Sequence, residues 1–258
     1  MRRTESQRHA TPAAGVDLDA SGPRRRRRSR LVESLITREA IVLALAHAIA
    51  AARRSDTPYP HWLLRSCLPD EAVNRLLALP FPAPSLAGVS GKRELHNATR
   101  KYFDAENRAR FPICEGFCQA FQDERLTARI AEHFGARLAG TYLRVELAQD
   151  TDGFWLEPHT DLGVKAFTLL LYLSRDAQHV TLGTDIYEGD KRHVGRSPFE
   201  PGAAMVFVPS GITYHGFEQR RIEGVRKSVI VNYVTSEWRA REQLAFPDQP
   251  VVGSDPSA

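Results

Sequence analysis

Cysteine is scarce in this sequence, which has three thiols in 258 residues, Cys67, Cys114 and Cys118. Three irregularly spaced cysteines cannot build a disulfide framework, so we expect a reducing compartment and a cytoplasmic protein. Cys114 and Cys118 stand four residues apart and can share one face of a helix. No second cysteine pair lies near them in the sequence to complete a zinc site, so we interpret all three as unremarkable thiols.

Long apolar runs are missing too. No stretch approaches the roughly 18 apolar residues that a membrane-spanning helix needs, and the N-terminus lacks the apolar segment of a secretory signal. The sequence contains no internal repeat. An apolar content of 42% and a charged content of 26% are ordinary for a folded globular chain. The length suits one large domain with appendages, and we expect no membrane partner.

Residues 1–30 have few acidic and few large apolar side chains. Nine arginines lie there against Glu5, Asp17 and Asp19, a net charge of +6 that exceeds the +4 of the whole chain. The rest of the chain therefore carries about −2, which gives no general argument for nucleic acid. We expect residues 1–30 to be a disordered basic tail. Two alternatives are an artefact of start-site choice and weak contact of Arg24–Arg28 with RNA, DNA or acidic lipid.

The next part of the chain has helical patterns. Residues 31–54 are rich in Leu, Ile and Ala, and they predict a helix that forms, with its linker, the segment 31–58. A second helix is expected to open at Pro69-Asp70-Glu71, where acidic residues favour a first turn. Residues 107–123 and 125–134 predict two more helices, the last one stopping at Gly135, and residues 88–106 predict an irregular polar loop.

From Ala139 onward, short apolar or alternating segments between turn residues predict strands. The segments are 142–147, 154–157, 166–173, 203–208, 213–217 and 227–234. Helices followed by many short strands predict an α+β domain, with a double-stranded β-helix (jelly-roll) core and N-terminal supporting helices. We expect this domain to span 59–245, with the barrel at about 139–235 and a flexible C-terminal tail at 246–258.

His159-Thr160-Asp161 is the pattern in this region that carries chemistry. Residues two apart on a strand point to the same side, so His159 and Asp161 can bind one ion from one strand end. His215 follows Asp161 by 54 residues, on a separate expected strand. Two histidines and one carboxylate with open positions suit the Fe(II) of non-heme oxygenases, and this triad is our predicted metal and catalytic site. Zinc shares these ligands and is the alternative metal.

Arg226 and Ser228 lie on the last expected strand, two residues apart and therefore on one face. A guanidinium offers a planar fork that matches a carboxylate, and a hydroxyl can add a further hydrogen bond. A carboxylate clamp of this kind has no role in a structural zinc site. The pair therefore predicts binding of an organic acid beside the metal.

These residues resemble the motifs of the Fe(II)/2-oxoglutarate-dependent dioxygenases, particularly the prolyl-hydroxylase-like branch. The likeness covers about 139–235 and rests on Glu157–Asp161, Leu171–Ser174, Pro201-Gly202, His215 and Arg226–Ser228. Two positions depart from the family, which often has asparagine at Ser174 and tyrosine at Gln149. The resemblance implies that His159, Asp161 and His215 bind iron, and that Arg226, Ser228 and Tyr172 bind the distal carboxylate of 2-oxoglutarate.

The resemblance also implies the reaction. Dioxygen and 2-oxoglutarate would be consumed, succinate and carbon dioxide released, and an unactivated C–H bond of a small molecule or protein side chain hydroxylated, with ascorbate in support. One alternative is a cupin-like metal enzyme that does not use 2-oxoglutarate. The other is an inactive barrel that acts as a binding protein. For the unidentified prime substrate, the nearby candidates are Tyr142, Arg144 and Trp155.

Overall fold

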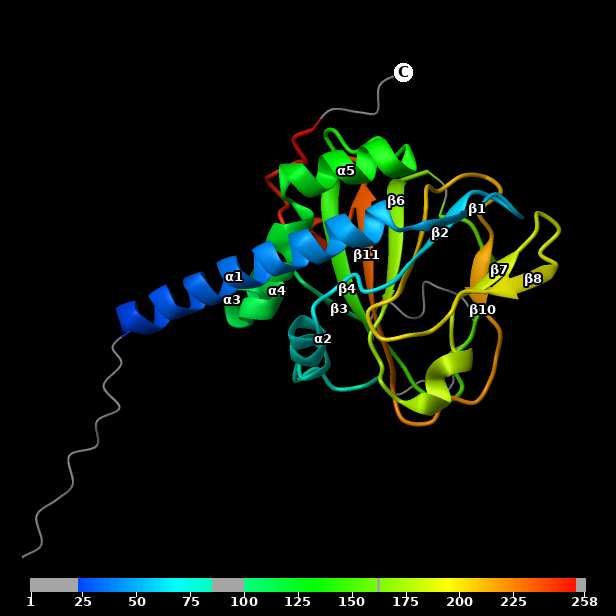
Figure 1. The fold of residues 1–258 in the computed structure, drawn as a ribbon, viewed down its shortest axis with the longest axis horizontal. Helices are drawn as coiled ribbons and strands as arrows, with labels where there is room; N and C mark the ends of the chain where they lie inside the picture. Colours follow the sequence, from blue (N-terminus) through cyan, green and yellow to red (C-terminus); the bar gives the residue numbers. More distant parts are fainter. Residues whose placement is uncertain (1–22, 85–99, 162, 254–258) are drawn as a thin grey trace, which may run out of the picture.

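The computed structural model describes residues 23–84, 100–161 and 163–253, with the side chains of 23–27 and 36 left out (Figure 1). Two short 3₁₀ turns, η2 (Ala177–Thr181) and η3 (Arg241–Gln243), accompany the helices. The α-helices are α1 (Pro23–Ala50), α2 (Asp70–Leu77), α3 (Ala105–Arg110), α4 (Pro112–Phe121) and α5 (Glu124–Phe134). None of them, within the described residues, has the length and apolar character to cross a bilayer.

Eleven strands of the described chain form two antiparallel sheets. In the larger sheet the order is β1 (Arg53–Ser55), β2 (His61–Leu64), β9 (Ala204–Phe207), β6 (Lys165–Tyr172), β11 (Arg226–Val234), β4 (Tyr142–Asp150) and β3 (Lys101–Tyr102). In the smaller sheet the order is β5 (Leu156–His159), β10 (His215–Phe217), β7 (Asp185–Tyr187) and β8 (His193–Arg196). This mixture of helices and antiparallel sheets confirms the predicted α+β class.

The larger sheet separates two apolar cores, because alternate residues of each strand face opposite sides. On one side, Val145 of β4 and Val231 of β11 join the helices in the larger core. Helix α1 packs there against α4 and α5, and Figure 1 shows these helices covering one face of the sheet. On the other side, Leu170 of β6 joins Phe217 of the smaller sheet in a second core. This second side holds the cavity described below.

Most expected elements form where the patterns place them. Helix α2 begins at Asp70, and Gly135 caps α5 in the left-handed conformation with φ of 70°. All six expected strand segments contain a strand, but β1, β2, β3, β7 and β8 were not foreseen, and the helix expected over 107–123 is divided into α3 and α4. Strand β7 is three residues long and β8 is partly exposed, so neither carries a clear alternation over enough positions.

Both ends of the described chain differ from expectation. Helix α1 begins at Pro23, so residues 23–30 extend the helix rather than belonging to a disordered tail, since proline suits a first helical turn. Residues 1–22 lie outside the described part. At the other end, Phe246 and Val251 are buried in the larger core, and the Val251 N–H donates to Thr141 at 2.7 Å. Residues 246–251 therefore pack against the domain instead of forming a flexible tail.

Candidate active site

The smaller sheet brings the two predicted histidine ligands together. Strand β5 pairs with β10 so that His159 stands directly across from His215. Asp161 follows two residues after His159, and its Oδ1 lies 3.7 Å from Nε2 of His159 while its Oδ2 lies 3.8 Å from Nε2 of His215. Gly216 permits this close pairing, because a Cβ there would lie 2.7 Å from the carbonyl oxygen of Leu156.

The backbone orients both imidazoles toward a metal. Nδ1 of His159 lies 3.0 Å from the carbonyl oxygen of Glu157, and Nδ1 of His215 lies 3.0 Å from that of Thr213. A carbonyl only accepts, so each Nδ1 carries the proton and donates it. Each Nε2 then presents a lone pair toward the ligand carboxylate. The candidate ligand atoms all lie within 4.8 Å of one another, and their chemistry fits a divalent transition metal.

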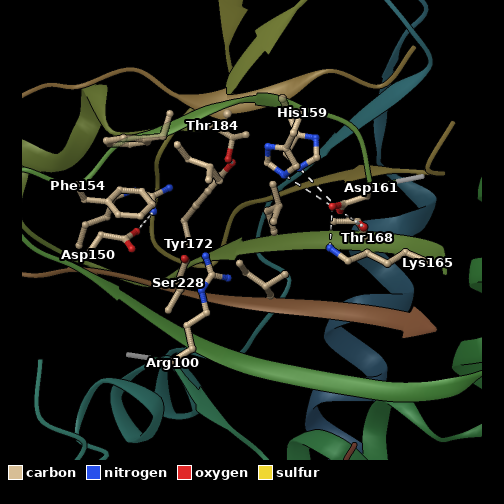
Figure 2. A pocket seen from close by; sticks show the side chains of 18 residues that line it. Arg100, Asp150, Phe154, His159, Asp161, Lys165, Thr168, Tyr172, Thr184 and Ser228 are labelled. Carbon is tan, nitrogen blue, oxygen red and sulfur yellow. Dashed lines mark hydrogen bonds and ion pairs between the residues drawn. The ribbon is translucent and has the colours of Figure 1, made fainter. Parts of the chain in front are cut away.

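The Asp161 carboxylate is held from two sides. The Thr168 hydroxyl donates to Oδ2 at 3.0 Å, and the Lys165 ammonium lies 2.7 Å from Oδ1. Asn232 donates in turn to the Thr168 hydroxyl at 3.0 Å. All four side chains are buried, and Figure 2 shows Asp161, Lys165 and Thr168 grouped on one side of the cavity. The hydrogen bonds from Asn232 through Thr168 fix the carboxylate before any metal binds.

A cavity of about 60 Å³ extends from the triad between the two sheets. The three candidate ligands contribute to its wall together with Tyr172, Arg226 and Ser228, so the predicted metal and organic-acid groups border one space. Its apolar wall includes Phe154, Leu156, Leu170, Phe217 and Ile230. Polar and charged side chains share the wall with these apolar ones, and convergent polar groups in an apolar surround are the usual form of a small-molecule site.

Arg226 has an acidic partner that sequence reasoning missed. Its Nη1 donates to Oδ2 of Asp150 at 2.5 Å, and its Nε donates to the carbonyl oxygen of Leu182 at 2.7 Å. The guanidinium also lies over the rings of Phe199 and Phe217. The expected strand segment ended at 147, but β4 continues through Asp150 and pairs it with Arg226 across the strands.

Tyr172 lines the same cavity, but its hydroxyl already has partners. It donates to Oγ1 of Thr184 at 2.9 Å and lies 2.5 Å from Oγ of Ser197. Ser228 stands directly across from Tyr172 in the β11–β6 register. The three residues predicted to bind the distal carboxylate therefore share one end of the cavity.

The three substrate candidates do not line this cavity within the described residues. Arg144 is 2% exposed and donates to Asn232 and Glu146, with its guanidinium over the Tyr102 and Trp238 rings. Arg144 is thus buried with its charge surrounded by partners from the protein itself. Tyr142 is half-buried beneath the guanidinium of Arg241, and Trp155 is half-buried after the turn that follows β4.

The sequence motifs that indicate the triad do not indicate two cationic residues of the cavity wall, Lys165 and Arg100. The contact of Lys165 with Asp161 depends on the turn between β5 and β6. Arg100 precedes β3, far from the barrel segment, and ion-pairs with Glu146. No pattern in the sequence marks Arg100, because only the pairing of β3 with β4 brings it to the cavity.

Comparisons with known proteins bear on the fold. No protein-family model matches the chain, and no curated protein does. Among solved structures, a prolyl-4-hydroxylase from Pseudomonas putida is similar with a TM-score of 0.50 and 17% identity, over 75% of this chain and 98% of that one. The chain has a prolyl-hydroxylase-like fold.

Two further solved structures are similar at lower scores. A prolyl hydroxylase from Trichoplax adhaerens, in complex with a hypoxia inducible factor peptide, gives a TM-score of 0.49 and 13% identity over 86% of this chain and 97% of that one. The viral collagen prolyl hydroxylase from Paramecium Bursaria Chlorella virus-1, in its 2OG complex, gives a TM-score of 0.44. Its identity is 12%, over 69% of this chain and 96% of that one. At these identities, the prolyl-hydroxylase-like likeness concerns the fold alone, and function has to be argued from the site.

Proposed function

We propose that the chain is an Fe(II)- and 2-oxoglutarate-dependent dioxygenase, built on a double-stranded β-helix, that hydroxylates a small molecule or a protein side chain. One observation carries the proposal. Two imidazoles with their Nε2 atoms turned to one carboxylate border the same cavity as Arg226 and Ser228. A metal-ligand set and an acid-binding group on one cavity suit a metal enzyme with an organic acid co-substrate.

His159, Asp161 and His215 would hold the iron. When bound with 2-oxoglutarate and dioxygen, the iron supplies the oxidative chemistry that yields succinate, carbon dioxide and a hydroxylated product. The chain itself contributes orientation: carbonyl oxygens fix both imidazole tautomers, and Thr168 fixes one carboxylate oxygen. Held ligands lose little freedom on metal binding, which favours an ordered site.

Arg226, Ser228 and Tyr172 would bind the distal carboxylate of the co-substrate at the other end of the cavity. Phe154 and Phe217 pack against each other, with ring centroids 5.3 Å apart, in the wall between the sheets. Such apolar walls exclude water and strengthen the charge interactions inside. The chain thereby limits which acid enters and in which direction it lies.

The experiment that tests the proposal measures succinate formed from 2-oxoglutarate in the absence of prime substrate, with Fe(II) and ascorbate present. We expect turnover in the unaltered protein and none in His159→Ala or His215→Ala, because each variant removes a metal ligand. His47→Ala, on the exposed side of α1, is the control and should keep full turnover. Turnover at the unaltered level in either ligand variant would refute the metal assignment.

Arg226→Ala separates this proposal from a cupin-like enzyme that does not use 2-oxoglutarate. In our proposal the variant needs much more 2-oxoglutarate for the same rate, since the distal carboxylate loses a charged partner. In the alternative enzyme, the rate has no dependence on 2-oxoglutarate to begin with. An inactive binding protein would form no succinate under any of these conditions.

A further inference from the structure

Some positive charges on the cavity wall are fully balanced by a carboxylate and others are not. This difference affects how the co-substrate proposed above is recognised. The charged residues that line the cavity within the described chain are Arg100, Asp150, Asp161, Lys165 and Arg226. All five are at most 9% exposed. Because a buried charge is costly unless it is paired, an incoming anion is best held where the wall carries excess positive charge.

The excess positive charge of the wall does not lie at Arg226, because Asp150 balances the charge of this guanidinium. Asp150 and Arg226 form an ion pair with 2.5 Å between Oδ2 and Nη1, and each side chain is 7% exposed. The pair is neutral as a unit, so an arriving carboxylate meets both an attractive guanidinium and a repulsive carboxylate. At the metal end, Lys165 and Asp161 likewise oppose one another at 2.7 Å.

Among the described residues, Arg100 belongs to a cluster with two cations and one anion. Glu146 is fully buried and forms ion pairs with both Arg100 and Arg144. Arg144 does not line the cavity, and its guanidinium lies between the rings of Tyr102 and Trp238. Arg100 does line it, so the net positive charge of this cluster is presented to a ligand through Arg100.

The strand register places Arg100 at the acid-binding end. Lys101 stands across from Leu147 in the β3–β4 pairing, and continuing this register by one residue sets Arg100 across from Ala148. Ala148 pairs with Ser228 on β11, and Ser228 pairs with Tyr172 on β6. Residues directly across antiparallel strands face the same side. Figure 2 shows Arg100 reaching into the cavity beside Ser228.

We propose that Arg100 is the residue that selects a dianionic co-substrate, by pairing with its distal carboxylate beside Ser228 and Tyr172. Asp150 weakens the attraction of Arg226 for the same carboxylate. The inference rests on the proposed function, because it assumes a 2-oxo acid bound at the metal. It assigns different tasks to the two arginines. Arg226 orients the carboxylate, and Arg100 supplies the charge that discriminates it from an uncharged end.

The test compares two acids of equal carbon number on the manganese-loaded, full-length protein by titration calorimetry. 2-Oxoglutarate has a distal carboxylate, whereas 2-oxopentanoate has a methyl group there. We expect Arg100→Met to weaken 2-oxoglutarate binding by about tenfold or more and to leave 2-oxopentanoate binding nearly unchanged. Arg100→Lys keeps the charge and should retain most of the preference, which controls for the loss of side-chain volume.

The Asp150→Asn variant is a second, independent test, in which the affinity for 2-oxoglutarate should rise rather than fall. Removing this carboxylate frees the charge of Arg226, so 2-oxoglutarate should bind more tightly than in the unaltered protein. A clamp in which Asp150 merely orients Arg226 would instead bind 2-oxoglutarate more weakly in this variant. That outcome, or an Arg100→Met variant that keeps its full preference for 2-oxoglutarate, overturns the inference.

Failure of the inference and failure of the proposed function look different in this experiment. If the unaltered manganese-loaded protein binds neither acid, the proposed function fails and the inference fails with it. If it binds 2-oxoglutarate in preference and Arg100→Met does so equally well, only the role of Arg100 is refuted. If Arg100→Met loses both acids to the same extent, Arg100 has a structural role and the inference is again refuted.

Discussion

Two places in the described chain bring a histidine close to two further candidate ligands, and only one of them is arranged for a metal. His159, Asp161 and His215 form the first, and Asp185, His193 and Glu218 the second. Both sets have their candidate ligand atoms within 4.8 Å of one another. Residue type and proximity therefore do not distinguish the two clusters.

The partners of the central carboxylate do distinguish them. Asp185 accepts from Arg196 at 2.6 Å, from Arg220 at 2.7 Å and from the backbone N–H of Glu218 at 2.6 Å. Burial alone would raise the pKa of Asp185, but these hydrogen bonds, first the one from Arg220, outweigh burial and lower it. Among its contacts with described residues, Asp161 has the Lys165 ammonium near one oxygen and the Thr168 hydroxyl on the other, and two imidazole Nε2 atoms face it.

The difference teaches what a metal site requires beyond its ligands. A carboxylate already surrounded by guanidinium groups gains little from a further cation, which those groups repel. The Asp185 cluster instead ties β7 and β8 to the residues after β10, and so holds together the sheet that carries His215. One cluster would bind a metal, and the other stabilises the sheet behind it.

The largest expected effect concerns metal stoichiometry. The comparison predicts that the protein binds one Mn(II) per chain at high affinity, and that His215→Ala abolishes this binding, because two ligands hold a divalent ion far less well than three. Titration calorimetry with Mn(II) alone, under oxygen-free conditions, measures the stoichiometry without depending on activity.

His193→Ala is the matched control, since it removes the histidine of the other cluster. We expect it to leave the stoichiometry at one and the affinity unchanged. Loss of a bound ion in this variant, or a second ion in the unaltered protein, would show that the guanidinium groups do not exclude a metal from Asp185.

The next largest effect is on the stability of the protein and concerns the cluster of Asp185, His193 and Glu218. Asp185→Asn removes a fully buried charge that faces Arg196 and Arg220, and breaking such a network should lower the free energy of unfolding by about 3–5 kcal/mol. Urea unfolding of the metal-free protein, followed by circular dichroism, measures this change. His193→Ala removes a partially exposed partner and should cost much less.

The same variant has a pH signature whose sign follows from the lowered pKa of Asp185. A carboxyl whose folded-state pKa is depressed contributes stability above its unfolded value, and this contribution is lost as the pH falls through the folded value. The unaltered protein should therefore lose stability on acidification below the ordinary value of 3.8. Asp185→Asn should lose less over that range, and an identical slope in both proteins would argue against the assigned partners.

The pairs His159–Asp161 and Arg226–Ser228 could be predicted from the sequence because their geometry is local, whereas the approach of His215 depends on the pairing of β10 with β5. A strand repeat of two residues places His159 and Asp161 on one side, and it does the same for Arg226 and Ser228. The helices and most strands followed from patterns of the same short range. What escaped prediction depends on which strands become neighbours, and no local pattern encodes that choice.

Asp150, Arg100 and Arg144 illustrate this limit. Asp150 lies beyond the expected strand segment 142–147, and only the β4–β11 register places it across from Arg226. Arg100 reaches the cavity only because β3 pairs with β4. The inward direction of Arg144 was predictable from alternation, but its partners Asn232 and Gln243 lie 88 and 99 residues away and take it out of the cavity wall. Hydrogen bonds over such separations decide which inward residues can meet a ligand.

The smallest expected effect tests whether the number of cations beside the carboxylate explains why one cluster would bind a metal and the other would not. Lys165 places one ammonium 2.7 Å from Oδ1 of Asp161, where it repels an incoming divalent ion. Lys165→Met removes that repulsion and should tighten Mn(II) binding, by roughly tenfold. Lys165→Arg keeps the positive charge and should bind Mn(II) with an affinity close to that of the unaltered protein. If Lys165→Met instead binds Mn(II) more weakly, the lysine serves to orient the carboxylate, and the number of cations around it no longer explains why the two clusters differ.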